Sequence, residues 1–193
     1  MSCKTKVINI YGSSSTGKST TAAMLYAYLK NKLISAEMSR EYIETWVWQE
    51  RTITNFDQYY IIGKEMYGKE VLFGKVDYII SDSPVMQTNF YLHRNREDLN
   101  FDSLGPFDPM IFDFITQAEL KGVEFYNFMV YRTGMKFEAK GRYQTEEQSN
   151  EDHVNMRRFL THPIRNKFLN LIDIKGDKEE RIRQIVEIIG LDK

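Results

Sequence analysis

The sequence of 193 residues has a single cysteine, Cys3, so no disulfide bond can form within the chain. No apolar run approaches the ~20 residues of a membrane-spanning helix, and no N-terminal segment resembles a secretion signal. These absences predict a reduced, soluble, cytoplasmic protein without a membrane partner. Because Cys3 lies just before the first predicted strand, we do not interpret it as a catalytic thiol.

The chain also lacks a large excess of positive or negative charge, because it has 26 Lys and Arg and 27 Asp and Glu, which gives a net charge of -1. This balance excludes the overall basic character that signals nucleic-acid binding, and it leaves a local basic patch open. Repeats, low-complexity tracts and linkers are absent too. The length therefore predicts one α/β domain over residues 1–193, with no indication of its oligomeric state.

What the sequence does contain is a phosphate-binding loop. Residues 12–20, GSSSTGKST, match the P-loop (Walker A) pattern G-x-x-x-x-G-K-[ST] at every fixed position. The β-branched character of Lys6–Tyr11 before it predicts a buried strand, and the apolar spacing of Thr20–Leu33 after it predicts a helix. A serine-rich helix cap would need neither Lys18 nor the second glycine. The predicted ATP-binding residues are Gly12, Ser13, Ser14, Ser15, Thr16, Gly17, Lys18, Ser19 and Thr20.

The chemistry of phosphate binding explains the composition of this loop. Gly12 and Gly17 permit backbone conformations and close approaches that a Cβ would block, so successive N–H groups can converge on phosphate oxygens. We expect Lys18 to reach the β- and γ-phosphates of ATP and the Ser19 hydroxyl to ligate Mg²⁺.

A carboxylate for the metal is expected at the end of another strand. Val76–Pro84 is a hydrophobic strand pattern that ends in Asp82, which would hold Mg²⁺ directly or through water. The strand predicted at Ile34–Met38 leads into the charged cluster Glu37–Tyr42. Since ligands bind beyond the carboxyl ends of parallel strands, we expect this cluster to contact the substrate. An ordinary solvated strand exit is the alternative.

The rest of the chain continues the alternation of strands and helices. Five strands in all, joined by right-handed crossovers, predict one parallel sheet with helices on both faces. The remaining predicted elements are a helix at 57–73 capped by Asn55 or Asp57, a helix or loop at 87–91, an exposed insertion at 92–108, a helix at 108–121 capped by Asp108, a strand at 125–131, a helix from the capping box at Thr145 to Leu160, a strand at 168–174, and a helix from the capping box at Asp177 to Gly190.

A basic loop follows the predicted strand at 125–131. It runs from Arg132 to Arg142 and should lie beside the phosphates, as the start of a lid over about residues 132–158. A wider set of basic residues could track the phosphates of a polymer, with a solvated surface as the alternative. That set is Arg94, Arg96, Lys136, Lys140, Arg142, Arg157, Arg158 and Arg165.

Aromatic residues make up 13% of the chain and are dense between residues 42 and 67. At helical spacing we interpret them as core residues, with a pocket for a planar ring as the alternative. This aromatic band consists of Tyr42, Trp46, Trp48, Phe56, Tyr59, Tyr60 and Tyr67.

Three segments in this order carry a family resemblance: Tyr11–Thr20, Ser39–Tyr42 and Ile79–Pro84. Together they resemble the small P-loop kinases related to the nicotinamide riboside kinase domain of the bacterial NAD-biosynthesis regulator, and phage proteins labelled as ATPases or kinases. The resemblance runs over most of the chain, and the P-loop is its specific part. It implies a P-loop kinase-like three-layer sandwich with a five-stranded core, located in the host cytoplasm if the chain is phage-encoded.

The resemblance also implies roles for individual residues. It assigns Lys18 and Ser19 to ATP and Mg²⁺, and Asp82 to the metal or to the acceptor hydroxyl. The acceptor would bind between the ends of the second and third strands, and lid arginines would lie over the transferred phosphoryl group. As the base, Asp82 ranks first and Glu37 second, and the family pattern also leaves Glu41 open. The acceptor-side residues are Arg40, Glu41 and Tyr42, and the lid residues are Arg132 and Arg142.

The activity predicted from the sequence is ATP- and Mg²⁺-dependent transfer of the γ-phosphate to a hydroxyl of a nucleoside, a nucleotide or a modified pyrimidine. One alternative is a kinase that acts on 5-hydroxymethyluracil within DNA. Another is an NTPase coupled to a partner, although Ser83 stands where motor-type ATPases commonly place a glutamate. A nucleotide-binding switch without turnover is a third.

Overall fold

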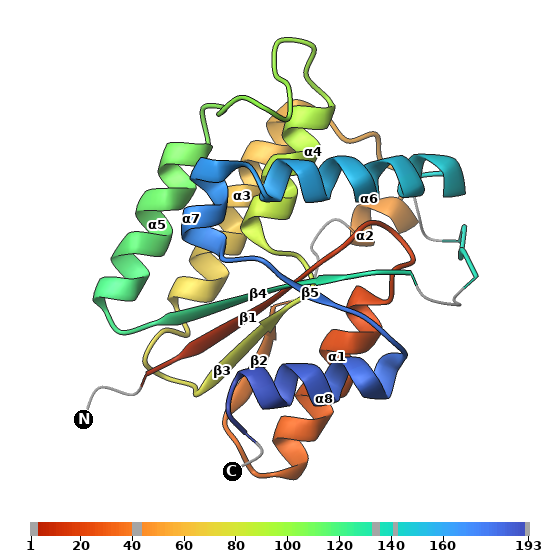
Figure 1. The fold of residues 1–193 in the computed structure, drawn as a ribbon. Helices are drawn as coiled ribbons and strands as arrows, with labels where there is room; N and C mark the ends of the chain where they lie inside the picture. The colour runs from red at the N-terminus through yellow and green to blue at the C-terminus, as the bar shows by residue number, and fades with distance from the viewer. Residues whose placement is uncertain (1–3, 40–43, 133–135, 141–142, 192–193) are drawn as a thin grey trace.

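The computed structural model describes residues 4–39, 44–132, 136–140 and 143–191, and they form a single α/β sandwich (Figure 1). One parallel sheet has the strand order β2-β3-β1-β4-β5, which confirms the predicted five-stranded parallel sheet. The strands are β1 (Lys6–Tyr11), β2 (Ala36–Ser39), β3 (Tyr78–Ser81), β4 (Glu124–Val130) and β5 (Ile172–Ile174). The helices are α1 (Lys18–Asn31), α2 (Glu44–Trp48), α3 (Asn55–Glu70), α4 (Val85–Arg94), α5 (Asp108–Leu120), α6 (Glu146–Leu160), α7 (Pro163–Leu169) and α8 (Lys178–Ile188).

Helices cover both faces of the sheet, because a parallel sheet buries both of its faces. On one face α1 and α8 pack against Ile8, Ile10 and Phe128, with Leu25 and Ile185 at the centre of the contact. On the other face α3, α4, α5, α6 and α7 build a second apolar cluster. Figure 1 shows α1 and α8 below the sheet and this second group of helices above it. All strands therefore end at one edge, and the P-loop follows β1 there.

Two predicted helix caps are corrected by the structure. The N-cap of α3 is Thr54, and Asp57 occupies the third helical position of a capping box rather than the cap itself. At α5 the N-cap is Phe107, without a side-chain cap bond, and Asp108 lies in the first turn. The Asp108 carboxylate instead accepts hydrogen bonds from the Gly105 N–H and from Arg165. The capping boxes at Thr145 and Asp177 are confirmed.

The predicted strand at 168–174 is wrong in its first half. Residues 163–169 form α7, and β5 covers only Ile172–Ile174. Pro163 fixes the first helical turn, the His162 side chain accepts from the Ile164 N–H, and Asn170 ends the helix in a left-handed conformation with φ of 45°. The apolar residue at position 168 is explained by packing between helices, because the Phe168 ring stacks on Phe112 with centroids 4.3 Å apart.

The aromatic band is mostly on the surface, which corrects its interpretation as core. Phe56 and Tyr67 on α3 are 81% and 68% exposed, and Tyr60 and Trp48 are more than half exposed. Trp46 is buried. Tyr59 is partly buried, and its ring stacks on Phe107 at the base of the 95–107 connection. Tyr42 lies outside the described residues. 

The segment 92–108 is anchored rather than simply exposed. His93, Gly105 and Asp108 are buried in it, and Arg165 from α7 reaches Asp108 and the carbonyls of Phe101 and Ser103. The whole of this connection is therefore held against α4, α6 and α7. Among the residues with a described structure, no helix has the length and apolar character needed to cross a bilayer.

Candidate active site

The P-loop connects β1 to α1 in the conformation that its glycines allow. Gly12 has φ of 154°, and a Cβ at this position would lie 2.6 Å from Thr16 Oγ1. Gly17 has φ of 85° and immediately precedes the first residue of α1. Ser15 also adopts a positive φ, of 58°, at the tip of the loop. The loop is therefore a tight turn that closes onto a helix N-terminus, which is the arrangement that binds phosphate groups.

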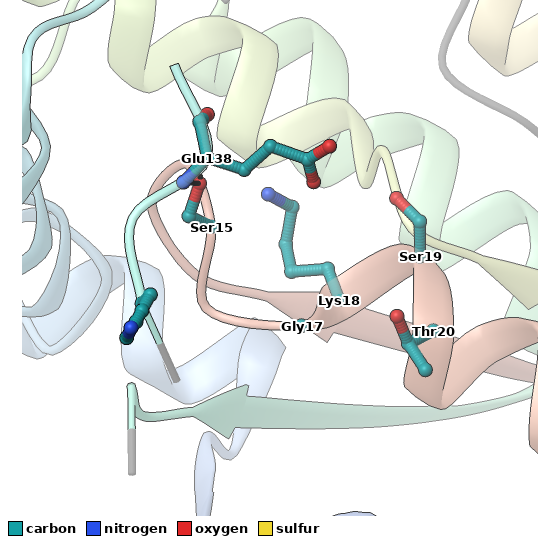
Figure 2. A pocket seen from close by; sticks show the side chains of 7 residues that line it. Ser15, Gly17, Lys18, Ser19, Thr20 and Glu138 are labelled. Atoms are coloured by element: carbon teal, nitrogen blue, oxygen red, sulfur yellow. Dashed lines mark hydrogen bonds between the residues drawn. The ribbon is translucent and has the colours of Figure 1, made fainter. Parts of the chain in front are cut away.

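Lys18 and the loop hydroxyls face a pocket of about 120 Å³ (Figure 2). The Lys18 ammonium donates to the Ser13 carbonyl at 3.2 Å, and Thr16 Oγ1 donates to the same oxygen at 2.8 Å. Figure 2 shows Lys18 extending into the pocket toward the carboxylate of Glu138, which enters from the opposite side. The lining residues are Ser15, Gly17, Lys18, Ser19, Thr20, Lys136 and Glu138.

Asp82 lies next to the P-loop because β3 pairs with β1. The register places Asn9 opposite Ser81, so Asp82 leaves β3 beside Ile10, two residues before the P-loop begins at Gly12. Asp82 is only 5% exposed, and its Oδ1 atom has no hydrogen-bond partner. A buried carboxylate oxygen without a donor suits a hard cation such as Mg²⁺, and the exposed Ser19 hydroxyl at the start of α1 would offer a second oxygen. These residues fit a bound magnesium ion.

The described residues contain no group of three or more His, Cys, Asp or Glu side chains that could cage a metal by themselves. Mg²⁺ in phosphoryl-transfer sites is bound by one or two protein ligands together with substrate phosphates. The sparse donor set at Ser19 and Asp82 is of that kind.

A buried polar cluster on α3 was missed by sequence reasoning. Glu65 accepts from Ser83 Oγ at 2.6 Å and from Thr88 Oγ1 at 3.1 Å, and Lys69 donates to the Ser83 carbonyl and to Ser39 Oγ, both at 3.5 Å. Burial lowers the pKa of the Lys69 ammonium, and the negative charges of Glu65 and Asp82 offset this effect only in part. The cluster ties the ends of β2 and β3 together.

The only sequence signal for this cluster was the position of Glu65 and Lys69. They lie four residues apart on the apolar face of α3, in line with the buried Ile61 and Ile62. Charged residues on such a face have a structural or functional partner, because an unpaired buried charge is costly.

The lid contacts the P-loop through side chains as well as its backbone. The Glu138 N–H donates to Ser15 Oγ at 3.1 Å, and Ser14 Oγ donates to Gln144 Oε1 at 2.6 Å. From α6, Ser149 Oγ lies 2.7 Å from the Ser14 carbonyl. Glu138, Gln144 and Ser149 therefore lie against Ser14 and Ser15 at the tip of the P-loop.

Arg132, which follows β4, contacts the P-loop and is one of the two arginines that the sequence predicts for a lid. Its guanidinium donates to the Ser14 carbonyl at 3.4 Å, to Ser149 Oγ at 3.0 Å and to the Glu146 carboxylate at 2.8 Å. The other lid arginine, Arg142, and the acceptor-side residues Arg40, Glu41 and Tyr42 lie outside the described residues.

Glu37 does not lie with Asp82, contrary to its predicted position at a strand end. Residue 37 pairs with Ile79 inside β2, and the strand continues to Ser39. At a rise of about 3.3 Å per residue, Glu37 lies well before the edge at which Asp82 emerges. We therefore do not retain Glu37 as a base.

The basic residues proposed as a polymer track have carboxylate partners at five of the eight positions. Arg94 pairs with Asp152 at 2.8 Å and Arg157 with Asp173 at 3.0 Å, and ion pairs also join Arg96 to Asp98 and Arg158 to Asp102. Arg165 is fully buried against Asp108. These pairs remove most of the positive charge available to a nucleic-acid backbone.

A family model described as an AAA domain matches residues 7–181, which include the P-loop and Asp82. The chain belongs to the AAA domain family. No curated protein matches this AAA domain in sequence.

Several solved structures resemble this AAA domain over nearly their full length. A deoxyadenosine kinase from M. mycoides with dCMP and dCDP bound has a TM-score of 0.59 at 15% identity, covering 95% of this chain and 98% of the other. The thymidylate kinase of Ehrlichia chaffeensis has a TM-score of 0.57 at 12% identity, covering 96% and 99%. The APS kinase of Mycobacterium tuberculosis has a TM-score of 0.54 at 10% identity, covering 97% and 99%. At such identities the likeness shows the fold, which is that of P-loop kinases.

Proposed function

We propose that this AAA domain protein is an ATP- and Mg²⁺-dependent phosphotransferase that moves the γ-phosphate to a hydroxyl of a nucleoside, a nucleotide or a modified pyrimidine. The observation that carries the proposal is the parallel pairing of β1 with β3, because the P-loop follows β1 and Asp82, whose Oδ1 has no hydrogen-bond partner, follows β3 at the same edge of the sheet. The lid across the P-loop and the kinase fold of the structural neighbours support it.

In this proposal the donor is bound by the P-loop. The N–H groups of residues 13–18 and the N-terminus of α1 bind the α- and β-phosphates, and the Lys18 ammonium moves from the Ser13 carbonyl to the γ-phosphate. The Ser19 hydroxyl and Asp82 would hold Mg²⁺, which neutralises charge on the β- and γ-oxygens. Arg132 contributes positive charge from the lid side. Phosphoryl transfer needs chiefly positioning and charge stabilisation, and this arrangement supplies both.

The acceptor is proposed to bind where β2 and β3 end. Asp82 can accept the proton of an acceptor hydroxyl, a step typically worth ~10²- to 10⁴-fold in rate. The Glu65–Lys69 cluster keeps the two strand ends at a fixed separation. Arg40, Glu41 and Tyr42 follow β2 directly in the sequence, and we propose them as acceptor contacts.

The second candidate function is an NTPase that couples hydrolysis to a partner. The observation in its favour is Glu138, whose carboxylate enters the phosphate pocket opposite Lys18 (Figure 2). A carboxylate in this position could activate a water molecule in place of the missing glutamate at Ser83. A DNA acceptor is less well supported, because Arg94, Arg96 and Arg158 each form an ion pair with a carboxylate of the chain itself.

Labelled ATP with Mg²⁺, offered against a panel of acceptors, tests the proposal. The panel contains deoxynucleosides, nucleoside monophosphates, nicotinamide riboside, adenylyl sulfate and DNA that contains 5-hydroxymethyluracil. We expect label transfer to one small acceptor class and ADP release that depends on that acceptor. Lys18→Met should lower the rate of transfer by at least ~10²-fold, because it removes the positive charge that stabilises the transferred phosphoryl group. Lys30→Met, on the exposed side of the same helix, is the matched control.

Three outcomes would contradict the proposal of a kinase for a small acceptor in different ways. Rapid ATP hydrolysis that no acceptor changes, and that Glu138→Gln abolishes, would establish the NTPase instead. Transfer only to the modified DNA would establish the polymer acceptor. Equal transfer by Lys18→Met and Lys30→Met would remove the P-loop from the reaction.

A further inference from the structure

Two arginines are the largest fully buried side chains of the described structure, and they differ in their partners. Arg165 and Arg181 are both 0% exposed. Arg165 is held by the Asp108 carboxylate at 2.7 and 2.9 Å. Within the described ranges no carboxylate forms an ion pair with Arg181, and its guanidinium donates only to backbone carbonyls. The cation at residue 181 therefore lacks the partner that its counterpart has.

The three carbonyls that Arg181 contacts belong to three separate segments. Nη1 donates to the Thr16 carbonyl in the P-loop at 2.8 Å, and Nε donates to the Gly176 carbonyl at 3.1 Å. Nη2 donates to the Tyr131 carbonyl directly after β4. These segments follow β1, β4 and β5, which are neighbours in the sheet. One side chain from α8 thus joins three consecutive connections at the edge where the P-loop lies.

The connection between β5 and α8 is fixed to its own helix, so Arg181 links the P-loop to a rigid support. The Asp177 N–H donates to Glu180 Oε2 and the Glu180 N–H donates to Asp177 Oδ1, both at 2.8 Å. Gln184 Nε2 donates to the Lys175 carbonyl at 2.7 Å. Gly176 has φ of 98°, and a Cβ there would lie 2.2 Å from the Glu180 side chain.

Stability alone does not explain a cation in this position. Burial lowers the pKa of Arg181, and the charge of Asp177 only partly opposes that effect. A buried cation without a paired carboxylate carries a desolvation cost, which hydrogen bonds to neutral carbonyls offset only in part. A buried cation whose hydrogen bonds all go to backbone carbonyls, one of them in the P-loop, is instead suited to a site where an anion arrives later.

We propose that Arg181 is a positioning residue of the donor site, which orients the P-loop through the Thr16 carbonyl and whose charge is compensated when the triphosphate binds. This inference rests on the proposed role of the P-loop in binding ATP. The guanidinium fixes the direction of the Thr16 carbonyl, and in this proposal it thereby keeps the neighbouring N–H groups of the loop directed at the phosphates. Arg181 does not touch the substrate itself, and it acts through the loop.

Calorimetric ATP binding with Mg²⁺, together with KM and kcat, tests the inference on Arg181→Met and Arg181→Lys. Loss of charge-assisted hydrogen bonds predicts a rise of about 10- to 100-fold in the Kd and KM for ATP in Arg181→Met. Arg181→Lys retains the charge and one or two of the contacts, so we expect a smaller rise. Arg183→Met, an exposed arginine on the same helix, should match the wild-type protein. The melting temperature without ATP is recorded for each variant.

A purely structural role would change the melting temperature without ATP and leave the ATP affinity of the folded variant unchanged. That result, in Arg181→Met or, if this variant does not fold, in Arg181→Lys, would overturn the inference. The inference would also be overturned if the Kd for ATP of Arg181→Met did not exceed the Kd of Arg183→Met. Failure of the wild-type protein to bind ATP would instead refute the proposed function, so the two failures are distinguishable.

Discussion

The buried pair between Arg165 and Asp108 should contribute more to the stability of the fold than any exposed ion pair. Asp108 is fully buried and accepts from Arg165 Nε at 2.7 Å, from Arg165 Nη2 at 2.9 Å and from the Gly105 N–H at 2.7 Å. The guanidinium also lies 3.7 Å from the centroid of the Phe159 ring. Arg165→Met removes the cation and leaves the buried carboxylate with only the Gly105 N–H, the Asn89 amide and His93 beside it.

The expected cost follows from the burial of both partners. Breaking a buried pair by removing one partner costs about 3–5 kcal/mol, because the other charge remains uncompensated. For a chain of this length that corresponds to a drop in Tm of about 10 °C. Arg158→Met is the matched control, since Arg158 pairs with Asp102 and both side chains are more than half exposed. That variant should lose little stability.

The pH dependence of unfolding gives a second measure of the same pair. Burial opposes ionisation of Asp108, but hydrogen bonds from His93, Arg165 and the Gly105 N–H outweigh it and lower its pKa to about 2. A carboxyl group whose pKa is lowered by folding stabilises the folded state at pH values above its usual pKa near 3.8. This stabilisation is lost as the pH falls from about 4 to 2. The size is about 2.5 kcal/mol, from 1.36 kcal/mol per pKa unit.

Urea unfolding of four variants at pH 7 and pH 3 measures both effects. The variants are the wild-type protein, Arg165→Met, Asp108→Asn and the double variant. We expect each single variant to lose several kcal/mol and the double variant to lose less than their sum, since neither charge is then left alone. Equal losses in Arg165→Met and Arg158→Met, or additive losses in the double variant, would refute the reasoning.

Three further predictions concern the edge of the sheet and the lid. Asp82→Asn should lower the transfer rate by orders of magnitude, and an unchanged Mg²⁺ dependence in a metal titration would remove Asp82 from the metal site. Lys69→Met should lower kcat about tenfold or more with little change in the KM for ATP, because Lys69 holds Ser39 and Ser83 at the acceptor side; an unaltered kcat would limit the cluster to a structural role. Burial, against the charge of Arg94, raises the pKa of Asp152 to about 6, so wild-type stability should decline by up to about 3 kcal/mol as the pH rises from 4 to 6. Asp152→Asn should flatten that part of the urea-derived pH profile, and an unchanged slope would contradict the assignment.

The elements that could be predicted from the sequence are those encoded by neighbouring residues. Thr145 and Asp177 start their helices through bonds to residues three positions away, and both capping boxes were predicted. The P-loop and its flanking strand were predicted for the same reason. At α7 the local signals were Pro163 and Asn170, but the apolar run that ends at Ile174 suggested one long strand. The stacking of Phe168 on Phe112, which explains that apolar character, joins segments far apart in the chain.

The polar residues that surround the P-loop could not be predicted because their partners are distant in sequence. Glu65 meets Ser83 across 18 residues, and Ser149 meets Ser14 across 135. Arg181 meets Thr16 across 165 residues. In the sequence Glu65, Ser149 and Arg181 lie on ordinary amphipathic helices, and only the crossover connections of the sheet bring these helices to the P-loop.

The two halves of the proposed reaction are therefore encoded differently. The donor half is local, since residues 12–20 provide the loop, the lysine and one metal ligand. The acceptor half combines the ends of β2 and β3 with the inner face of α3, where Lys69 bridges Ser39 and Ser83. A family can keep the first half as a short motif while the second changes through substitutions scattered over three elements. This separation explains why P-loop kinase folds at 10% to 15% identity include a deoxyadenosine kinase, a thymidylate kinase and an APS kinase. It also makes the acceptor panel, rather than any ATP-binding assay, the measurement that tests the acceptor of the proposed reaction.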